Sequence, residues 1–284
     1  MAGLEIFLVV VAGVFGLLIG SFLNVVAYRV PAHISLMRES RCPHCEARIK
    51  PWHNVPVLGW IVLRGTCAHC GARISARYPI VEAITGVVFA GVTWWGLTLG
   101  LDTLVPRYST GDPGTMWALG IVIVAFLYFA AISIVLTLID LDTHRLPNVI
   151  VLPSYLVAGI LFTIAAWLTG DWGALLRAGI GMAAMYLFYW LLRLAKPSGM
   201  GGGDVKLAGV LGIYLGWIGW GALAVGAFAA FLFGGVFGIA LMVARRAGRK
   251  TAIPFGPWMI LGAWAGIFTG EPIGRWYTQL FIGV

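Results

Sequence analysis

The chain has 284 residues, of which 60% are hydrophobic and only 11% are charged. Its mean hydropathy of +0.93 excludes a soluble domain, because a folded domain of this length cannot bury so much apolar surface. The formal net charge of +8 suits an anionic partner, and we expect membrane lipid headgroups rather than nucleic acid, because the basic residues lie between apolar segments.

Long apolar segments recur from one end of the chain to the other. Runs of about 20 apolar residues can span a bilayer as helices, which satisfy their own backbone hydrogen bonds in lipid. None of the runs alternates polar and apolar residues as a membrane β-barrel strand does. We therefore predict an all-α polytopic membrane protein. Its bundle of about eight transmembrane helices lies near residues 5–30, 79–100, 115–139, 148–168, 173–194, 204–219, 221–244 and 254–270.

The first segment and the basic residues predict how the chain is oriented. The first segment contains Glu5 and lacks a basic start, so we expect a retained helix and not a cleaved signal peptide. All but Arg107, Arg177 and Arg275 of the 19 Lys and Arg residues fall on one side of the predicted helices. Because cytoplasmic loops are enriched in Lys and Arg, both termini should be exterior and the loop 31–78 cytoplasmic.

All four cysteines fall in that loop, as CPHC (Cys42 and Cys45) and CAHC (Cys67 and Cys70). Two CxxC pairs about 20 residues apart have the spacing of a tetrahedral zinc site, in which each pair supplies two thiolates from one tight turn. The alternative is two disulfides, which require an oxidising compartment. We predict a structural zinc ion, because four thiolate ligands leave no open position for water.

Four carboxylates lie at or near the predicted cytoplasmic edge of the membrane: Glu82, Asp140, Asp142 and Asp204. Ionisable groups at membrane depth are costly, so each is a candidate functional residue. Glu82 follows the motif ARYP, where an ion pair with Arg77 would be a sufficient structural role. Asp140 and Asp142 are separated by about 200° around a helix, so only one of them can face the interior of the bundle.

Asp204 ends a glycine-rich run, SGMGGGD, at the start of the sixth predicted helix. Glycines let a backbone approach closely and leave room for an extended peptide. Asp204 and an aspartate of the third helix would then meet at one membrane face, where two carboxylates that share a proton suit aspartyl hydrolysis. The alternative is a helix-breaking turn in which Asp204 is only an N-cap.

Six motifs follow one another along the chain: GSFLNVVAYRVP, the two CxxC pairs, ARYPIVE, IDLDTHRLPN, GMGGGDVKLAG and IPFGP. In these motifs the chain resembles the bacterial type IV prepilin peptidases, which are bifunctional leader peptidases and N-methyltransferases of the GxGD class of intramembrane aspartyl proteases. The resemblance implies that Asp140 and Asp204 are catalytic. It implies that Asp142 is an adjacent residue without a catalytic role, and the reverse assignment of Asp140 and Asp142 stays open.

The resemblance also implies a substrate and a cofactor. Enzymes of this family remove the short basic leader of type IV prepilins or type II secretion pseudopilins after a glycine, at the cytoplasmic face of the inner membrane. They then methylate the new N-terminus with S-adenosylmethionine as donor. No glycine motif between a strand and a helix supports this donor independently. The residues expected to support the site or bind substrate are Gly201, Gly202, Gly203, Lys206, Glu82, Asn24 and Asp142.

On this basis the chain divides into four parts: a first transmembrane helix (1–30), a cytoplasmic four-cysteine zinc-binding loop (31–78), a second transmembrane helix with an exterior loop (79–114), and a membrane aspartyl peptidase core (115–284). Three alternatives are a protease with other transmembrane substrates, an assembly scaffold, and a proton-coupled transporter that uses Asp140 and Asp204 as a relay. A transporter should place carboxylates near the bilayer midplane and show inverted repeats, and the sequence has neither feature.

Overall fold

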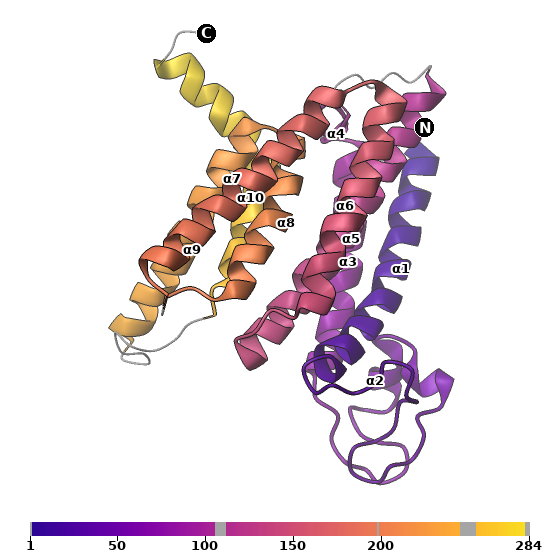
Figure 1. The fold of residues 1–284 in the computed structure, drawn as a ribbon. Coiled ribbons are helices and arrows are strands. Elements are labelled where there is room, and N and C mark those ends of the chain that lie inside the picture. Colours follow the sequence, from indigo (N-terminus) through magenta and orange to yellow (C-terminus); the bar gives the residue numbers. More distant parts are fainter. Residues whose placement is uncertain (1, 106–111, 198, 245–253, 282–284) are drawn as a thin grey trace. The chain divides into compact units, whose positions relative to one another are not determined.

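The computed structural model describes residues 2–105, 112–197, 199–244 and 254–281. These residues form helices and connecting loops, with two isolated β-bridges in the loop 31–78, so the predicted all-α class is confirmed (Figure 1). The elements are α1 (Ala2–Arg29), the 3₁₀ turn η1 (Pro51–Asn54), α2 (Leu58–Val62), α3 (Arg77–Leu97), α4 (Leu101–Leu104), α5 (Pro113–Thr143), α6 (Asn148–Thr169), α7 (Trp172–Ala195), α8 (Gly202–Ile218), α9 (Trp220–Val243) and α10 (Gly256–Phe281).

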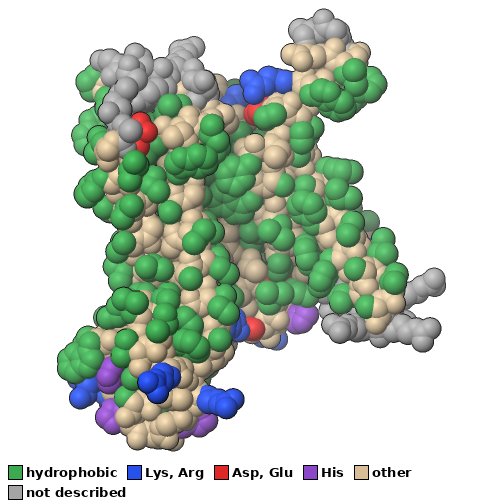
Figure 2. Space-filling model, turned by 180° about the vertical axis from the view of Figure 1, so that it is seen from behind, with side chains coloured by type: hydrophobic (Ala, Val, Ile, Leu, Met, Phe, Trp, Pro, Cys, Tyr) green, Lys and Arg blue, Asp and Glu red, His purple; other side chains and the backbone are tan. Residues whose placement is uncertain are grey.

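Six of the described helices are long and apolar enough to cross a membrane: α1, α3, α5, α6, α7 and α9. The two remaining predicted spans are also helices. However, α8 has only 17 residues, about 26 Å at 1.5 Å per residue, and α10 contains several Gly, Trp and Pro residues along with Glu271. Hydrophobic side chains cover the flanks of the helices, and charged side chains gather towards their ends (Figure 2). The chain is a multi-pass membrane protein.

Several basic residues used to predict the orientation lie outside the described residues. They are Arg107, Arg245, Arg246, Arg249 and Lys250.

The chain forms two compact units. Unit 1 comprises residues 1–99 and 127–135, and unit 2 comprises residues 100–126 and 136–284. The long helix α5 therefore contributes to both.

In unit 1, α1 and α3 pack closely because glycines of α1 face α3. A Cβ atom at Gly16 would lie 2.7 Å from the carbonyl oxygen of Thr85, and one at Gly20 would lie 2.7 Å from the Cα atom of Glu82. Small residues at such positions bring two backbones together and replace the hydrophobic effect that lipid does not supply. Further along α1, the Asn24 amide donates a 3.1 Å hydrogen bond to the carbonyl of Tyr78.

The last residue of α1 organises the chain that follows it. The Arg29 guanidinium is 8% exposed and donates hydrogen bonds to the carbonyl oxygens of Ser35, Leu36, Arg38 and Glu39. The planar guanidinium presents several donors at fixed angles, so a single side chain can hold this turn of backbone.

In unit 2, α8 is the central helix. All of its residues from Leu207 to Ile218 are buried, as expected of a short helix that is apolar on every face. Glycine again permits the close approach of neighbours: a Cβ atom at Gly216 would lie 2.6 Å from the carbonyl oxygen of Arg177 on α7. The rings of Phe162 and Trp217 stack with centroids 4.5 Å apart, which packs α6 against α8.

Two charged residues satisfy the backbone groups where α8 ends and α9 begins. The Arg177 guanidinium donates 2.8 Å hydrogen bonds to the carbonyls of Gly216 and Trp217 at the end of α8. The Glu271 carboxylate, on α10, accepts hydrogen bonds from the amides of Gly221 and Ala222 in the first turn of α9, at 2.9 and 3.2 Å. A cation at a helix C-terminus and an anion at an N-terminus both complement the helix dipole.

We expect the substitution Glu271→Ala to lower the free energy of unfolding by about 2 kcal/mol, because it leaves two amides of α9 without their acceptor. Glu271→Gln keeps an acceptor oxygen and should cost less. Thermal unfolding of the purified protein in detergent measures both changes. An alanine variant that melts at the wild-type temperature would contradict this role. Glu5→Ala, which removes a carboxylate from the first turn of α1, is the matched control.

Candidate active site

Asp140 lies near the end of α5 and is held by a residue far away in the sequence. Its side chain is only 4% exposed, and its Oδ2 atom accepts a 3.1 Å hydrogen bond from the backbone amide of Gly256, the first residue of α10. A Cβ atom at position 256 would lie 2.7 Å from this oxygen, so the contact requires glycine. Asp142 is exposed, which places it on the other side of the helix from Asp140.

Asp204 lies in the first turn of α8 and is partly buried. Its Oδ2 atom accepts a 2.9 Å hydrogen bond from the backbone amide of Gly201, which occupies the N-cap position. The alternative N-cap role for Asp204 is therefore wrong, because the carboxylate lies inside the helix and reaches back to its start. A carboxylate in this position also satisfies one of the otherwise unpaired amides of the helix.

The two aspartates of unit 2 face a common region. Leu146, in the loop after α5, contacts the glycines next to both of them: Cβ atoms at Gly203 and Gly256 would lie 2.9 and 3.4 Å from its side chain. Both aspartates lie beside glycines that meet the same leucine side chain. The structure therefore brings together a buried aspartate from α5 and a partly buried one from α8.

The glycine run before Asp204 is packed tightly by neighbouring side chains. A Cβ atom at Gly202 would lie 2.7 Å from the Arg193 guanidinium of α7, and Gly203 meets Leu146. Two residues beyond Asp204, the Lys206 ammonium donates a 2.9 Å hydrogen bond to the Asn148 side chain at the start of α6. The first turn of α8 is thus joined to both α6 and α7.

Two groups near the aspartates were not identified as site residues from the sequence. One is the Gly256 amide, which belongs to the motif IPFGP. The other is Tyr189 on α7, which is fully buried and whose ring contacts Phe255, the residue before Gly256. The Tyr189 hydroxyl has no hydrogen-bond partner among the described residues, and the ring also contacts Phe231. A lone tyrosine in an apolar helix gives no sequence signal.

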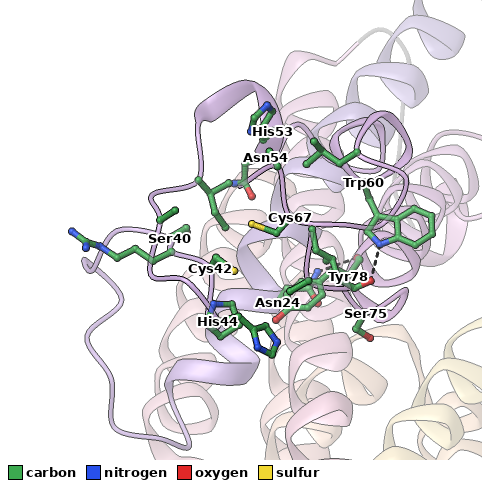
Figure 3. Close-up of a pocket in the computed structure, with 18 of the residues that line it drawn as sticks. Asn24, Ser40, Cys42, His44, His53, Asn54, Trp60, Cys67, Ser75 and Tyr78 are labelled. Atoms are coloured by element: carbon green, nitrogen blue, oxygen red, sulfur yellow. Dashed lines mark hydrogen bonds between the residues drawn. The ribbon is translucent and has the colours of Figure 1, made fainter. Parts of the chain in front are cut away.

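Glu82 and Asn24 belong to unit 1. Glu82 is 8% exposed, and its Oε2 atom accepts a 2.7 Å hydrogen bond from the amide of Val57, which precedes α2. Both residues line a cavity of about 470 Å³ between the α1–α3 pair and the loop 31–78 (Figure 3).

The four cysteines form one cluster. The Sγ atoms of Cys42, Cys45, Cys67 and Cys70 all lie within 4.8 Å of one another, and the cysteines are unpaired by disulfides. The Cys42 and Cys70 sulfurs are 3.9 Å apart, near the spacing of about 3.8 Å that tetrahedral Zn–S bonds of 2.3 Å require.

Each CxxC pair folds as the same tight turn. In the first turn, the amide of Cys42 bonds to the carbonyl of Ala47, and the amide of Glu46 bonds to Cys42. In the second, Cys67 bonds in the same way to Ala72 and to Gly71. The residues present therefore fit a zinc ion with four thiolate ligands.

The family comparisons cover both units. Residues 14–95 match the model of the bacterial peptidase A24 N-terminal domain, and residues 127–239 match that of the type IV leader peptidase family. No solved structure is a significant match.

Three curated relatives carry the name prepilin leader peptidase/N-methyltransferase. The protein of Aeromonas hydrophila is 34% identical, over 94% of this chain and 93% of its own length. That of Neisseria gonorrhoeae is 37% identical over 93% and 91%, and that of Stutzerimonas stutzeri is 32% identical over 95% and 94%. These findings support the peptidase expectation and give no support to a transporter. The chain belongs to the type IV leader peptidase family.

Proposed function

We propose that this protein is a membrane aspartyl endopeptidase that removes the short basic leader of type IV prepilins or type II secretion pseudopilins, and then N-methylates the new N-terminus. The observation that carries the peptidase part is that Asp140 on α5 and Asp204 on α8 each lie beside a glycine that meets Leu146. The names of the relatives support both activities.

The two carboxylates would divide the hydrolysis between them. Two acids at close range do not both ionise readily, so they share a proton. One acts as the general base that activates water, and the other donates a proton to the scissile carbonyl oxygen. The amides of Gly256 and Gly201 each hold one carboxylate oxygen, so the second oxygen of each acid can act on the reactants.

The residues around the dyad have supporting roles in this proposal. Gly201, Gly202 and Gly203 let neighbouring side chains pack against the start of α8, since Cβ atoms there would lie 3.1, 2.7 and 2.9 Å from Asp204, Arg193 and Leu146. Lys206 fixes this turn through its bond to Asn148. Asp142, exposed beside the dyad, would attract the basic leader without taking part in catalysis.

The orientation follows from the distribution of basic residues. We place both chain termini outside the inner membrane, and the loop 31–78 and the aspartates at its cytoplasmic face. The four-cysteine cluster would hold a structural zinc ion there. Four thiolates close the coordination sphere, so this metal would stabilise the loop and not activate water.

The second activity requires a methyl donor, which we take to be S-adenosylmethionine. The donor supplies a methyl group on a positively charged sulfur. When bound, the donor would supply this methyl group to the neutral N-terminal amine, which would release one proton as the methylated amine forms. Two of the expected site residues, Glu82 and Asn24, belong to unit 1, whereas Asp140 and Asp204 both belong to unit 2.

The purified protein in detergent should cut a peptide that carries a basic leader and a Gly-Phe junction, and the cut should follow the glycine. With S-adenosylmethionine present, the released product should gain one methyl group, about 14 Da, which mass spectrometry resolves. A peptide whose glycine is replaced by a bulky residue is the control. A protein that leaves the peptide intact would contradict the proposed function, and one that cuts without methylating would restrict it to the peptidase part.

A further inference from the structure

Tyr189 lies inside unit 2, on the face of α7 that packs against α8. The buried residues of α7 form one stripe along the helix: Ala174, Ala178, Gly181, Met185 and Tyr189. Their spacing of three or four residues is that of a single helix face. Tyr189 is the last of them, and its side chain has no exposed surface.

The contacts between α7 and α8 place this tyrosine opposite Asp204. The two helices run antiparallel: Gly216 of α8 meets the backbone of Arg177, and Gly212 of α8 meets that of Gly181. A step of four residues forward on α7 therefore matches a step of four residues back on α8. Two further steps of this size lead from Gly181 to the tyrosine and from Gly212 to Asp204.

Tyr189 also lies close to both backbone segments that hold the aspartates. One turn further along α7, the Arg193 guanidinium would lie 2.7 Å from a Cβ atom at Gly202, in the turn that begins α8. The Tyr189 ring itself contacts that of Phe255, with centroids 6.3 Å apart. Phe255 directly precedes Gly256, whose amide binds the buried carboxylate of α5. The tyrosine is therefore packed beside the two supports of the dyad.

The hydroxyl of Tyr189 is energetically costly in these surroundings. It is buried without a hydrogen-bond partner among the described residues. The rings that contact Tyr189 are those of phenylalanines, namely Phe188, Phe231 and Phe255. Leaving a buried hydroxyl unpaired costs about 1–3 kcal/mol. Phenylalanine would fill the same space without this cost, so packing alone does not account for a tyrosine. The hydroxyl instead suits a polar partner that arrives with the reactants.

We propose that Tyr189 is a further catalytic residue of the peptidase, an inference that rests on the proposed cleavage activity. Its hydroxyl donates a hydrogen bond to the scissile carbonyl oxygen while water adds to the carbonyl carbon. In this step a carbon–oxygen bond forms, the π electrons of the carbonyl move to its oxygen, and that oxygen takes the proton of the acidic aspartate. The proton of the water goes to the other carboxylate, and the tyrosine keeps its own. A fixed donor stabilises the negative charge that develops on the oxygen.

The substitution Tyr189→Phe in the full-length protein tests the proposal, because it removes the hydroxyl and keeps the ring. We expect kcat for cleavage of the leader peptide to fall about 100-fold, as is typical when one donor to a developing charge is lost, and KM to stay within a few-fold. The melting temperature should equal or exceed that of the wild type, because the variant lacks an unpaired buried hydroxyl. Tyr214→Phe is the matched control. Tyr214 is also fully buried, but it lies ten residues beyond Asp204 in α8, about 15 Å along the helix, so its kcat should not change.

A second measurement uses an inhibitor that resembles the tetrahedral intermediate. The probe is the leader peptide with its scissile carbonyl replaced by a carbon that carries a hydroxyl group, which cannot be cleaved. Its inhibition constant should rise at least about tenfold in Tyr189→Phe, because the hydrogen bond to the reacting oxygen is lost. The inhibition constant of Tyr214→Phe should match that of the wild type. A purely structural role of Tyr189 would not separate the affinity for this probe from KM.

Two results would overturn the proposal, and they differ in what else they reject. If Tyr189→Phe cleaves as fast as the wild type, or if its loss of activity comes with a lower melting temperature and an unchanged inhibition constant, the hydroxyl is not catalytic and the aspartyl dyad stands. If the wild type leaves the leader peptide intact, the proposed peptidase function fails and the role of Tyr189 fails with it.

Discussion

Replacing either Asp140 or Asp204 by asparagine is expected to reduce leader cleavage by about a thousandfold or more. Each substitution removes one member of a pair that must exchange a proton, and residues that act as a unit typically lose most of the rate when either is removed. Asparagine keeps the size of the side chain and an acceptor oxygen for the Gly256 or Gly201 amide, so the helix contacts should persist. The initial rate of peptide cleavage, followed by mass spectrometry, measures the loss.

Asp142→Asn is the matched control, because it makes the same chemical change two residues away on an exposed position. We expect this variant to keep its kcat within a few-fold of wild type, because the proposed role of Asp142 is to attract the leader and not to exchange a proton. If it is inactive and Asp140→Asn cleaves normally, the catalytic aspartate of α5 has been misassigned by two residues. If Asp140→Asn and Asp204→Asn both remain active while folded, the aspartyl mechanism is wrong.

The period of the α-helix alone predicts that the two aspartates of α5 lie on different faces of the helix. Positions two residues apart face nearly opposite directions, and the structure has Asp140 buried and Asp142 exposed. The sequence could not indicate which of the two is buried. That depends on the Gly256 amide, which lies 116 residues further along the chain. A contact made by a backbone group carries no side-chain signal and appears only once the helices are packed.

Local sequence patterns predicted the cysteine cluster, but they did not predict the contacts of Glu82. The spacing within and between the CxxC pairs reflects short-range turn geometry, and the four sulfurs do converge. Glu82, in contrast, accepts a hydrogen bond from Val57, a residue whose φ of +60° is uncommon for a β-branched side chain. Turns of this kind are set by tertiary contacts, so neither the bond nor the cavity beside it follows from composition or periodicity.

Removing zinc is expected to unfold the loop 31–78 while the membrane helices remain folded. The loop has little regular structure beyond η1 and α2, and its two CxxC turns are joined through the cysteine cluster. Structural zinc sites of this type contribute on the order of 10 kcal/mol of binding free energy, more than a loop of this size can supply from packing. A strong chelator, or the substitution Cys67→Ser, should therefore make the loop sensitive to trypsin. Mass spectrometry of the digest identifies cuts after Arg38, Arg48 and Arg64.

The histidines inside the two CxxC turns provide the matched controls for this prediction. His44 and His69 are exposed, and the close cluster is formed by the four sulfurs. His44→Ala and His69→Ala should bind about one zinc ion per chain and resist trypsin as the wild type does. Loss of zinc from either variant would mean that an imidazole replaces a thiolate, and the site would then have a different ligand set. A loop that stays resistant after all zinc has been removed would show that Arg29 and its carbonyl partners, and not the metal, hold this part of the chain together.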